Sequence, residues 1–461
     1  MGDPLASTGL SEHGGHLRVG ANRRHLTYTD GTTFFWLSDT YWFVPTSHMP
    51  YDSSSNPHFK SMYQLCVALR KKQGFNALTV GFLGERKELQ TKKEPDPGSF
   101  HGKDDLWGVD TWTEDAIAFW RKADRYILYA NEAGFVVTMN LIWANDFLRY
   151  LNAGKAREEL VEMVKPVHRY VIARLGSYNV LWHITAEYNH GENIKADLKG
   201  EHLQVGRFVR EIDPYKDRPM TIFSWPGHMA SAEDAFREDW YQLRLAQGGH
   251  FRSPWQAASY KWLLEWYNHE RIMPLLVGEH NFERIYEKEN DSGDVRAAAW
   301  RGMMCGSCGY TYGATGLWYP NRDENDTSMG TWGNVAWWHA LDYPGAGQMG
   351  VMRSFFEQYR WWDMEPCMDL LRVVPSRQAD HNMPTARKLG NELLVIYVPG
   401  SLQRDAKILV PSSAAGQQCW FFNPRDGIKT EPVTLAMPKE ADGLIALPQR
   451  PDDLDWVIVV Q

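Results

Sequence analysis

The stretch of sequence that decides the fold is LVEMVKPVHRYVIARLGSYNVLWHITAE, residues 160–187. In its first half, apolar side chains recur at steps of three and four, at Leu160, Val164, Val167, Val171 and Leu175. This spacing predicts an amphipathic helix that ends at Gly176, with Pro166 either kinking the helix or marking its start. The second half, NVLWHITAE from Asn179, predicts a strand. A helix followed directly by a strand is the repeating unit of a parallel α/β sheet.

Strands of this kind recur eight times between about residue 30 and residue 320. The runs are FFWLSDTYW (34–42), GFNALTV (74–80), GFVVTMNLIW (134–143), NVLWHITAE (179–187), RPMTIFSW (218–225), DWYQLRLA (239–246), MPLLVGEH (273–280) and GYTYGATGLW (309–318). A second helix is predicted before Gly134, from Ile117, Trp120, Ala123, Ile127 and Ala130. Eight strands with intervening helices match the size of a (β/α)8 TIM barrel. A doubly wound sheet is the alternative, but no strand precedes a Gly-x-Gly-x-x-Gly turn.

The texture of the sequence changes after about residue 365. Short runs separated by Pro, Gly, Asn and Asp follow one another: LLVIYV, AKILV, CWFF, TEPVTLAM, GLIAL and DWVIVV. We therefore expect a barrel over residues 1–365 and a small all-β sandwich over residues 366–461. We expect the sandwich to support the barrel, and truncation within DWVIVV to expose an edge prone to aggregation. Asp30-Gly31 predicts a hairpin turn at the barrel entrance.

The composition of the 461 residues is that of a globular protein, with 43% hydrophobic residues and a formal net charge of −8. The acidic balance and the lack of long Lys/Arg runs argue against a nucleic-acid partner. No run of 18 apolar residues predicts a membrane span, and the first residues lack the apolar core of a signal peptide. We expect a cytoplasmic location, or a secreted or periplasmic one if a leader has been removed. The 21 Trp, 21 Tyr and 19 Phe suit stacking against sugar rings.

Other patterns of reactive residues are weaker. Five cysteines are too few for a disulfide framework, and packing is a better interpretation of the Cys305/Cys308 pair than a redox or zinc site. His183, Glu187 and His190 have the spacing HxxxExxH, but alternate residues of a strand face opposite sides and do not converge on one metal. The acidic segment 321–330 lacks the glycine and closing glutamate of an EF-hand. We therefore expect no metal and no cofactor.

Two carboxylates stand at the ends of predicted strands. Glu187 closes strand four and Glu279 closes strand seven, and barrel enzymes place their active sites at these carboxyl ends. Hydrolysis of a glycosidic bond with retention needs two carboxyl groups about 5 to 5.5 Å apart. A structural salt bridge is the better interpretation of one such glutamate, but two at matching positions favour catalysis.

Other side chains at or near strand ends are expected to bind the substrate. They are Asp39, Trp42, Asn76, Asn140, Trp143, His228, Gln242 and Tyr310. Asp39 would equally suit a helix cap. Trp42 and Trp143 could form a stacking wall together with Trp225, whereas Trp36 and Trp182 lie in mid-strand and are expected in the core.

Several of these segments together resemble the apiosidase-like glycoside hydrolases, a family of (β/α)8 barrels in the large retaining group. The segments are FFWLSDTYW, KKQGFNALTV, VLWHITAEYN, QLRLAQGGH, LLVGEHNFE and GSCGYTYGATGLW, in this order. CWFFNPRDG at 419–427 resembles a turn of the β-sandwich that often follows in that family, named there a collagen-binding domain. The resemblance spans nearly the whole chain, and the order of its short motifs carries it.

The resemblance implies that the chain hydrolyses a glycosidic bond, with Glu187 as acid/base and Glu279 as nucleophile. In many members, Trp is followed after five residues by Asp in a Gly-Asp pair. Here Trp182 is followed by Glu187, preceded by Ala186, so the carboxyl group lies about one methylene further out. The residue before the acid/base is not the Asn common in the wider group, so Asn140 or Asn189 would have to hold the sugar 2-hydroxyl.

The expected function is hydrolysis of a plant or microbial glycan, with release of a terminal furanose such as apiose. The expected partner is therefore a carbohydrate. The alternative is a glycan-binding protein that kept the aromatic pocket and lost turnover. A barrel enzyme that attacks an ester or amide is disfavoured because no Gly-x-Ser-x-Gly elbow occurs.

Overall fold

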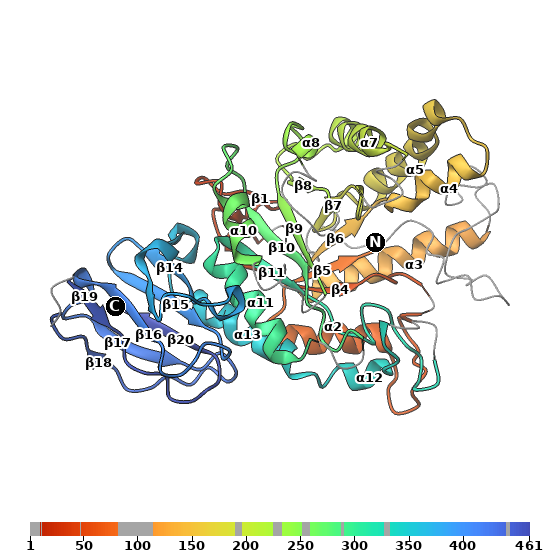
Figure 1. Ribbon diagram of the computed structural model, residues 1–461. Helices are drawn as coiled ribbons and strands as arrows, with labels where there is room; N and C mark the ends of the chain where they lie inside the picture. Colours follow the sequence, from red (N-terminus) through yellow and green to blue (C-terminus); the bar gives the residue numbers. More distant parts are fainter. Residues whose placement is uncertain are drawn as a thin grey trace.

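The structure is a computed structural model, which describes residues 10, 12–46, 48–81, 114–189, 196–224, 233–250, 259–286, 290–326, 332–438 and 443–461. Figure 1 shows two parts side by side, a sheet surrounded by helices and a β-rich part formed by the last hundred or so residues, drawn in blue. Within the described residues, no helix has the length and apolar character needed to cross a membrane.

Eight strands of the first part form one parallel sheet. They are β4 (Trp36–Tyr41), β5 (Ala77–Val80), β6 (Val136–Asn140), β7 (Val180–His183), β8 (Met220–Thr221), β9 (Arg244–Gly249), β10 (Leu275–His280) and β11 (Ser307–Tyr312). The sheet order is β8-β7-β6-β5-β4-β11-β10-β9, and the parallel bridges Met220–Tyr241 and Phe223–Leu245 join its two ends. The sheet is thus closed, and the predicted TIM barrel is confirmed.

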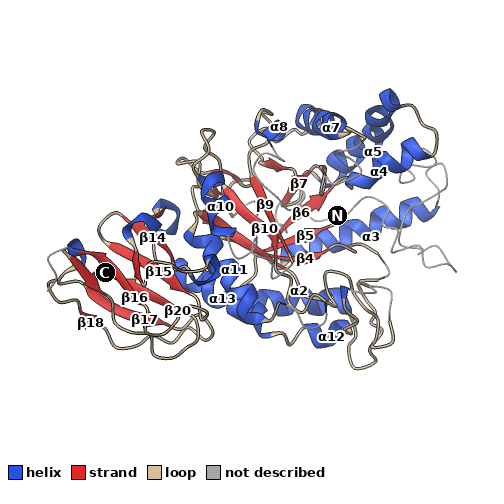
Figure 2. Cartoon of the chain, viewed as in Figure 1, coloured by secondary structure: helices blue, strands red, loops and turns tan. Residues whose placement is uncertain are grey.

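Helices surround the barrel strands (Figure 2). They are α2 (Met62–Lys72), α3 (Glu114–Glu132), α4 (Ala144–Asn152), α5 (Leu160–Leu175), α7 (Lys199–Ile212), α8 (Glu233–Phe236), α10 (Ser259–Tyr267), α11 (Ser292–Met304), α12 (Trp337–Ala340) and α13 (Pro344–Phe356). The two predicted helices are α3 and α5, and Pro166 lies inside α5 rather than at its start.

Strand β4 shows how the two faces of a barrel strand are used. Trp36 donates through Nε1 to Thr311 Oγ1 of β11 at 3.3 Å, inside the barrel. Asp39, three residues further along, faces the opposite side of the strand, where its carboxylate accepts a hydrogen bond from Arg70 Nε of α2 at 2.6 Å. Because both faces of such a strand are buried, apolar patterning alone does not reveal which residues point inward.

Strand β9 lies further along the chain than predicted. The sequence pattern placed strand six at 239–246, but the strand is Arg244–Gly249. Gly248 is part of the strand, and a Cβ added to it would lie 2.4 Å from the ring of His280. The glycine therefore permits close packing and does not mark a turn.

A small antiparallel sheet precedes the barrel. It consists of β1 (Arg18–Val19), β2 (Leu26–Thr27) and β3 (Thr33–Phe34). Leu26 lies opposite Phe34, and Gly31 in the connecting turn has a φ of 89°. This is the hairpin that Asp30-Gly31 predicts.

The C-terminal part consists of two antiparallel sheets. One contains β12 (Glu365–Pro366), β14 (Thr385–Leu389), β15 (Leu393–Val398), β20 (Trp456–Val460), β17 (Gln418–Phe422) and β18 (Val433–Thr434); the other contains β13 (Arg372–Val374), β16 (Lys407–Pro411) and β19 (Leu444–Ala446). Ile396 and Ile458 of the first sheet share a core with Val410 and Ile445 of the second. The predicted sandwich is confirmed, although β12, β13 and β14 were not among the predicted strands.

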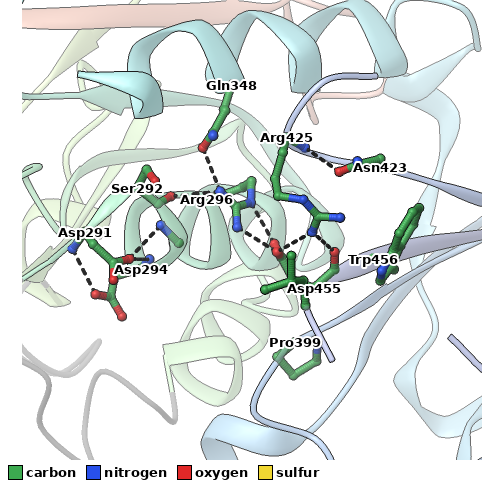
Figure 3. Close-up of polar contacts among 12 residues, drawn as sticks. Asp291, Ser292, Asp294, Arg296, Gln348, Pro399, Asn423, Arg425, Asp455 and Trp456 are labelled. Carbon is green, nitrogen blue, oxygen red and sulfur yellow. Dashed lines mark hydrogen bonds and ion pairs between the residues drawn. The ribbon is translucent and has the colours of Figure 1, made fainter. Parts of the chain in front are cut away.

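A buried ion-pair network joins the sandwich to the barrel (Figure 3). Asp455, directly before β20, accepts from Arg296 Nε and Nη2 of α11 at 2.7 and 2.6 Å. It also accepts from Arg425 Nη1 and the Tyr397 hydroxyl, both at 3.1 Å. Trp300 of α11 stacks on Tyr397, with ring centroids 6.2 Å apart. The two parts thus share buried contacts, and we call this region the seam.

Candidate active site

Glu279 lies at the carboxyl end of β10, where the pairing with β9 changes register on both sides of it. Leu276 lines the barrel interior, and Val277 lies against Gly302 of α11. Regular alternation would direct Glu279 outward with Val277. The shift in register, as in a β-bulge, instead allows the carboxylate to reach groups at the barrel mouth.

Glu187 follows β7, which is separated from β10 by β8 and β9 in the barrel wall. Its backbone φ of 55° lies in the left-handed region, which residues other than glycine rarely occupy. Neighbouring backbone hydrogen bonds hold the segment, from Ala186 N to Ile142 O at 3.2 Å and from Tyr188 N to Phe223 O at 3.1 Å. Such strain is retained where the surrounding structure fixes a side chain in a required position.

The amide of Gln247 joins the two glutamates. Its Nε2 donates to Glu187 Oε1 at 3.1 Å and to Glu279 Oε1 at 3.1 Å. These two oxygens can therefore be no further apart than about 6.2 Å. Two linear hydrogen bonds from one planar amide nitrogen, whose hydrogens point about 120° apart, would correspond to a separation of about 5.4 Å between the oxygens.

His250 gives Glu279 a second donor. Its Nε2 lies 2.8 Å from Glu279 Oε1, and its Nδ1 accepts from the backbone N–H of Phe282 at 3.3 Å. Because Nδ1 is an acceptor, the ring proton of a neutral His250 is on Nε2 and points to the carboxylate. Glu279 Oε1 thus accepts two hydrogen bonds, and Oε2 has no hydrogen-bond partner among the described residues.

Asn140, at the carboxyl end of β6, is fully buried. Neither Oδ1 nor Nδ2 has a hydrogen-bond partner in the described part of the chain, and the same holds for Gln247 Oε1. Asn140 is two residues beyond Thr138, which lines the barrel interior, so both side chains face inward. A buried amide without hydrogen-bond partners destabilises the folded protein, so such a group is expected where a bound ligand can form the missing hydrogen bonds.

The barrel interior below the mouth combines a few polar side chains with apolar ones such as Leu245 and Leu276. Thr79, Thr138, His183 and Thr221 line a cavity of about 10 Å³, close to the smallest volume that holds one water molecule. Burial lowers the pKa of His183 to about 3, so this ring is neutral at ordinary pH. Within the described ranges, no group of His, Cys, Asp and Glu side chains is arranged to hold a metal ion.

The family model described as Apiosidase-like, catalytic domain, matches residues 20–363, the range that contains the barrel and both glutamates.

The chain belongs to the apiosidase-like family.

Two solved structures share the fold of this apiosidase-like chain. A glycoside hydrolase family 5 protein from Bacteroides vulgatus is 20% identical, with 96% of this chain and 92% of that chain covered and a TM-score of 0.72. A second structure, described as a glycoside hydrolase, is 18% identical, with 99% and 97% covered and a TM-score of 0.72. No curated protein matches the sequence. The predicted family and enzyme class are confirmed, and the chain is an apiosidase-like glycoside hydrolase.

The apiosidase-like barrel brings several predicted residues together at its mouth. Glu187 and Glu279 meet through Gln247. Trp42 and Trp143 form an edge-to-face pair, with ring centroids 5.1 Å apart. Asn189 is buried two residues beyond Glu187. His228, Trp225 and His190 lie outside the described residues.

Four predicted binding residues have structural partners instead. Asp39 forms a buried ion pair with Arg70, so it neither faces the mouth nor caps a helix. Asn76 precedes β5 and bonds the backbone of Leu37 and Phe35. The prediction that Asn76 and Gln242 close strands is wrong, since Gln242 precedes β9, where its Oε1 accepts from Arg210 at 3.0 Å.

Tyr310 is the fourth of these residues. It alternates with the inward-facing Thr311, and its hydroxyl donates to the backbone carbonyl of His280. Cys305 and Cys308, the other reactive pair in the sequence, are buried free thiols, and burial raises the pKa of Cys308 to about 12. All these contacts are structural.

Sequence reasoning missed Gln247 and His250. Both belong to the run QLRLAQGGH at 242–250, which was recognised as a family segment but assigned to a strand that ended too early. The available signal was the spacing of two residues between Leu245 and Gln247, because residues two apart in a strand face the same side. Leu245 lines the barrel interior, so Gln247 also points inward, one layer closer to the mouth.

Proposed function

We propose that the chain is a retaining glycosidase in which Glu279 is the nucleophile and Glu187 the acid/base. The observation that carries this proposal is the shared Gln247 amide, which keeps the two bonded carboxylate oxygens within about 6.2 Å of each other. Retaining enzymes place their carboxyl groups about 5 to 5.5 Å apart, whereas inverting enzymes leave about 6.5 to 9.5 Å for a water molecule.

The two glutamates differ in a way that suits these roles. Glu279 is buried, and the N–H groups of Gln247 and His250 both contact its Oε1. Its Oε2 is the oxygen that attacks the anomeric carbon and forms the glycosyl-enzyme ester. His250 and Gln247 hold the carboxylate while Oε2 reacts.

Glu187 is half-buried, at the rim of the mouth. In the first step it donates a proton to the oxygen of the departing group, and in the second step it removes a proton from the water that hydrolyses the ester. The left-handed backbone at Glu187 fixes the direction of a side chain that is one methylene longer than aspartate.

The sugar unit would lie between the glutamates and contact the unpaired amides. Asn140 offers both a donor and an acceptor, and Gln247 Oε1 offers an acceptor, so they are suited to sugar hydroxyl groups. Asn140 would supply the contact to the 2-hydroxyl that Ala186 cannot make. Family membership favours a terminal furanose such as apiose, on a plant or microbial glycan, as the sugar released.

The test is a screen of 4-nitrophenyl glycosides and plant polysaccharides, followed by NMR of the first product formed from any substrate cleaved. We expect the anomeric configuration of the substrate to be kept. An inverted product would overturn the assignment of Glu279 as nucleophile. Binding without hydrolysis across the screen would favour the alternative of a glycan-binding protein.

A further inference from the structure

A series of aromatic rings leads from the carboxylates to the protein surface. His250, which bonds Glu279, lies 4.4 Å from Phe282 between ring centroids. Phe282 lies 5.9 Å from Trp318, and Trp318 lies 6.1 Å from Trp332. Trp332 and Tyr286 are stacked at 5.0 Å, with an angle of 25° between their planes. We call Phe282, Trp318, Trp332 and Tyr286 the ring path.

The exposure of these rings increases with distance from the site. Phe282 is 1% exposed, Trp318 9% and Trp332 39%. Trp332 is therefore a large apolar side chain that presents ring surface to solvent. The indole N–H of Trp318 is buried and has no hydrogen-bond partner among the described residues. A ligand with an apolar face could stack on the Trp332 ring, and a hydroxyl oxygen of the same ligand could accept a hydrogen bond from the Trp318 N–H.

The backbone segment that carries Tyr286 contains several residues in the left-handed region, Tyr286 among them. Among the described residues, seven other than glycine have a positive φ, and four of these lie in the segment after β10: Asn281, Arg284, Tyr286 and Asn290. The backbone N–H of Tyr286 donates to the carbonyl of Trp332 at 3.0 Å, which joins this segment to the one after β11. Strain that is held in this way positions a side chain for a function.

We propose that the ring path binds a second sugar of the substrate, beyond the unit held between Glu187 and Glu279. The ligand class is a neutral oligosaccharide or polysaccharide, because sugars combine apolar ring faces with hydroxyl groups. Phe282 and Trp318 share one buried cluster with Trp42 of the mouth, so the path is continuous with the catalytic site. This inference rests on the proposed function, because it extends the same substrate.

The experiment compares two substrates with the same terminal sugar, a 4-nitrophenyl glycoside and a trisaccharide. We expect Trp332→Ala to lower the ratio of kcat/KM for the trisaccharide to kcat/KM for the nitrophenyl glycoside by about 3- to 10-fold. Trp332→Phe keeps a ring and should restore part of the ratio. The matched control is Trp338→Ala in α12, whose ring contacts Trp337 and His339 and lies outside the path. An unchanged ratio in Trp332→Ala, or an equal fall in Trp338→Ala, overturns the inference.

A binding measurement separates this inference from the proposed function. Calorimetry with the trisaccharide is performed on Glu279→Gln, which should bind without turnover, and on the same variant with Trp332→Ala. Weaker binding in the second protein supports the ring path even if the unaltered chain hydrolyses nothing, and in that case only the proposed function fails. Equal binding, or no binding to either protein, overturns the ring path.

Discussion

The barrel mouth and the seam both contain a buried carboxylate, but the polar groups of the two regions differ in how fully they are hydrogen-bonded. At the seam, Asp455 accepts hydrogen bonds from Arg296 and Arg425 (Figure 3). It also accepts one from the Tyr397 hydroxyl. At the mouth, Glu279 accepts its two hydrogen bonds through Oε1, while the Asn140 amide and Gln247 Oε1 are buried and unpaired among the described residues. Buried polar groups without partners are unfavourable in a folded protein. The comparison therefore separates polar groups that are paired within the fold from unpaired groups that we propose bind the substrate.

The largest expected effect is at the mouth. Glu279→Gln should reduce kcat on every substrate by at least about 10⁴-fold, because an amide of the same size cannot form the ester. Steady-state kinetics measures this loss, and circular dichroism checks that the fold is kept. Glu265→Gln, an exposed position on α10, is the matched control and should keep full activity. Substantial activity in Glu279→Gln would reassign the nucleophile.

Glu187→Ala should have a smaller effect that depends on the substrate. We expect kcat on natural glycosides to fall by about 10²- to 10⁴-fold, because their leaving groups need a proton. Nitrophenyl glycosides, whose leaving group departs as an anion, should be cleaved much better, and azide should restore part of the rate. Equal losses on both kinds of substrate would count against the acid/base role.

Removing the seam carboxylate should affect stability and not chemistry. Asp455→Ala leaves Arg296 buried without its partner, so we expect the free energy of unfolding to fall by about 3 to 5 kcal/mol. Denaturant titration measures the loss, and kcat of the folded enzyme should not change. Asp453→Ala, an exposed neighbour, should change stability by less than about 0.5 kcal/mol. A seam that tolerates Asp455→Ala would remove the distinction between the two regions.

Asn140→Leu should have the opposite outcome. Since its amide has no partner in the described structure, an apolar side chain of similar size should leave the free energy of unfolding unchanged or raise it. The loss of hydrogen bonds to the sugar should lower kcat/KM by about 10- to 100-fold. Kinetics and denaturant titration on one sample test both parts. A large loss of stability would show that the amide supports the fold.

The sequence predicted the eight-stranded barrel and the location of both glutamates near the carboxyl ends of strands, because an apolar run followed by a lone carboxylate is a local signal. The predicted strand four extended to Glu187, whereas β7 ends at His183. It did not predict which face of a strand points inward, because both faces are buried. Asp39 and Tyr310 were therefore assigned to the mouth although they face outward. Gln247 was missed because the predicted strand ended at Ala246. Gly248 in fact continues the strand and permits the close approach of His280, which lies 32 residues further along the chain and is a neighbour only in three dimensions.

The place of β20 in the sandwich has a consequence for how the protein is made. β20 pairs with both β15 and β17, which do not pair with each other, and it follows both in the chain. During synthesis, each of these strands emerges from the ribosome with an edge that lacks its neighbour. Asp455 directly precedes β20, so the ion pair with the barrel forms at the same late stage.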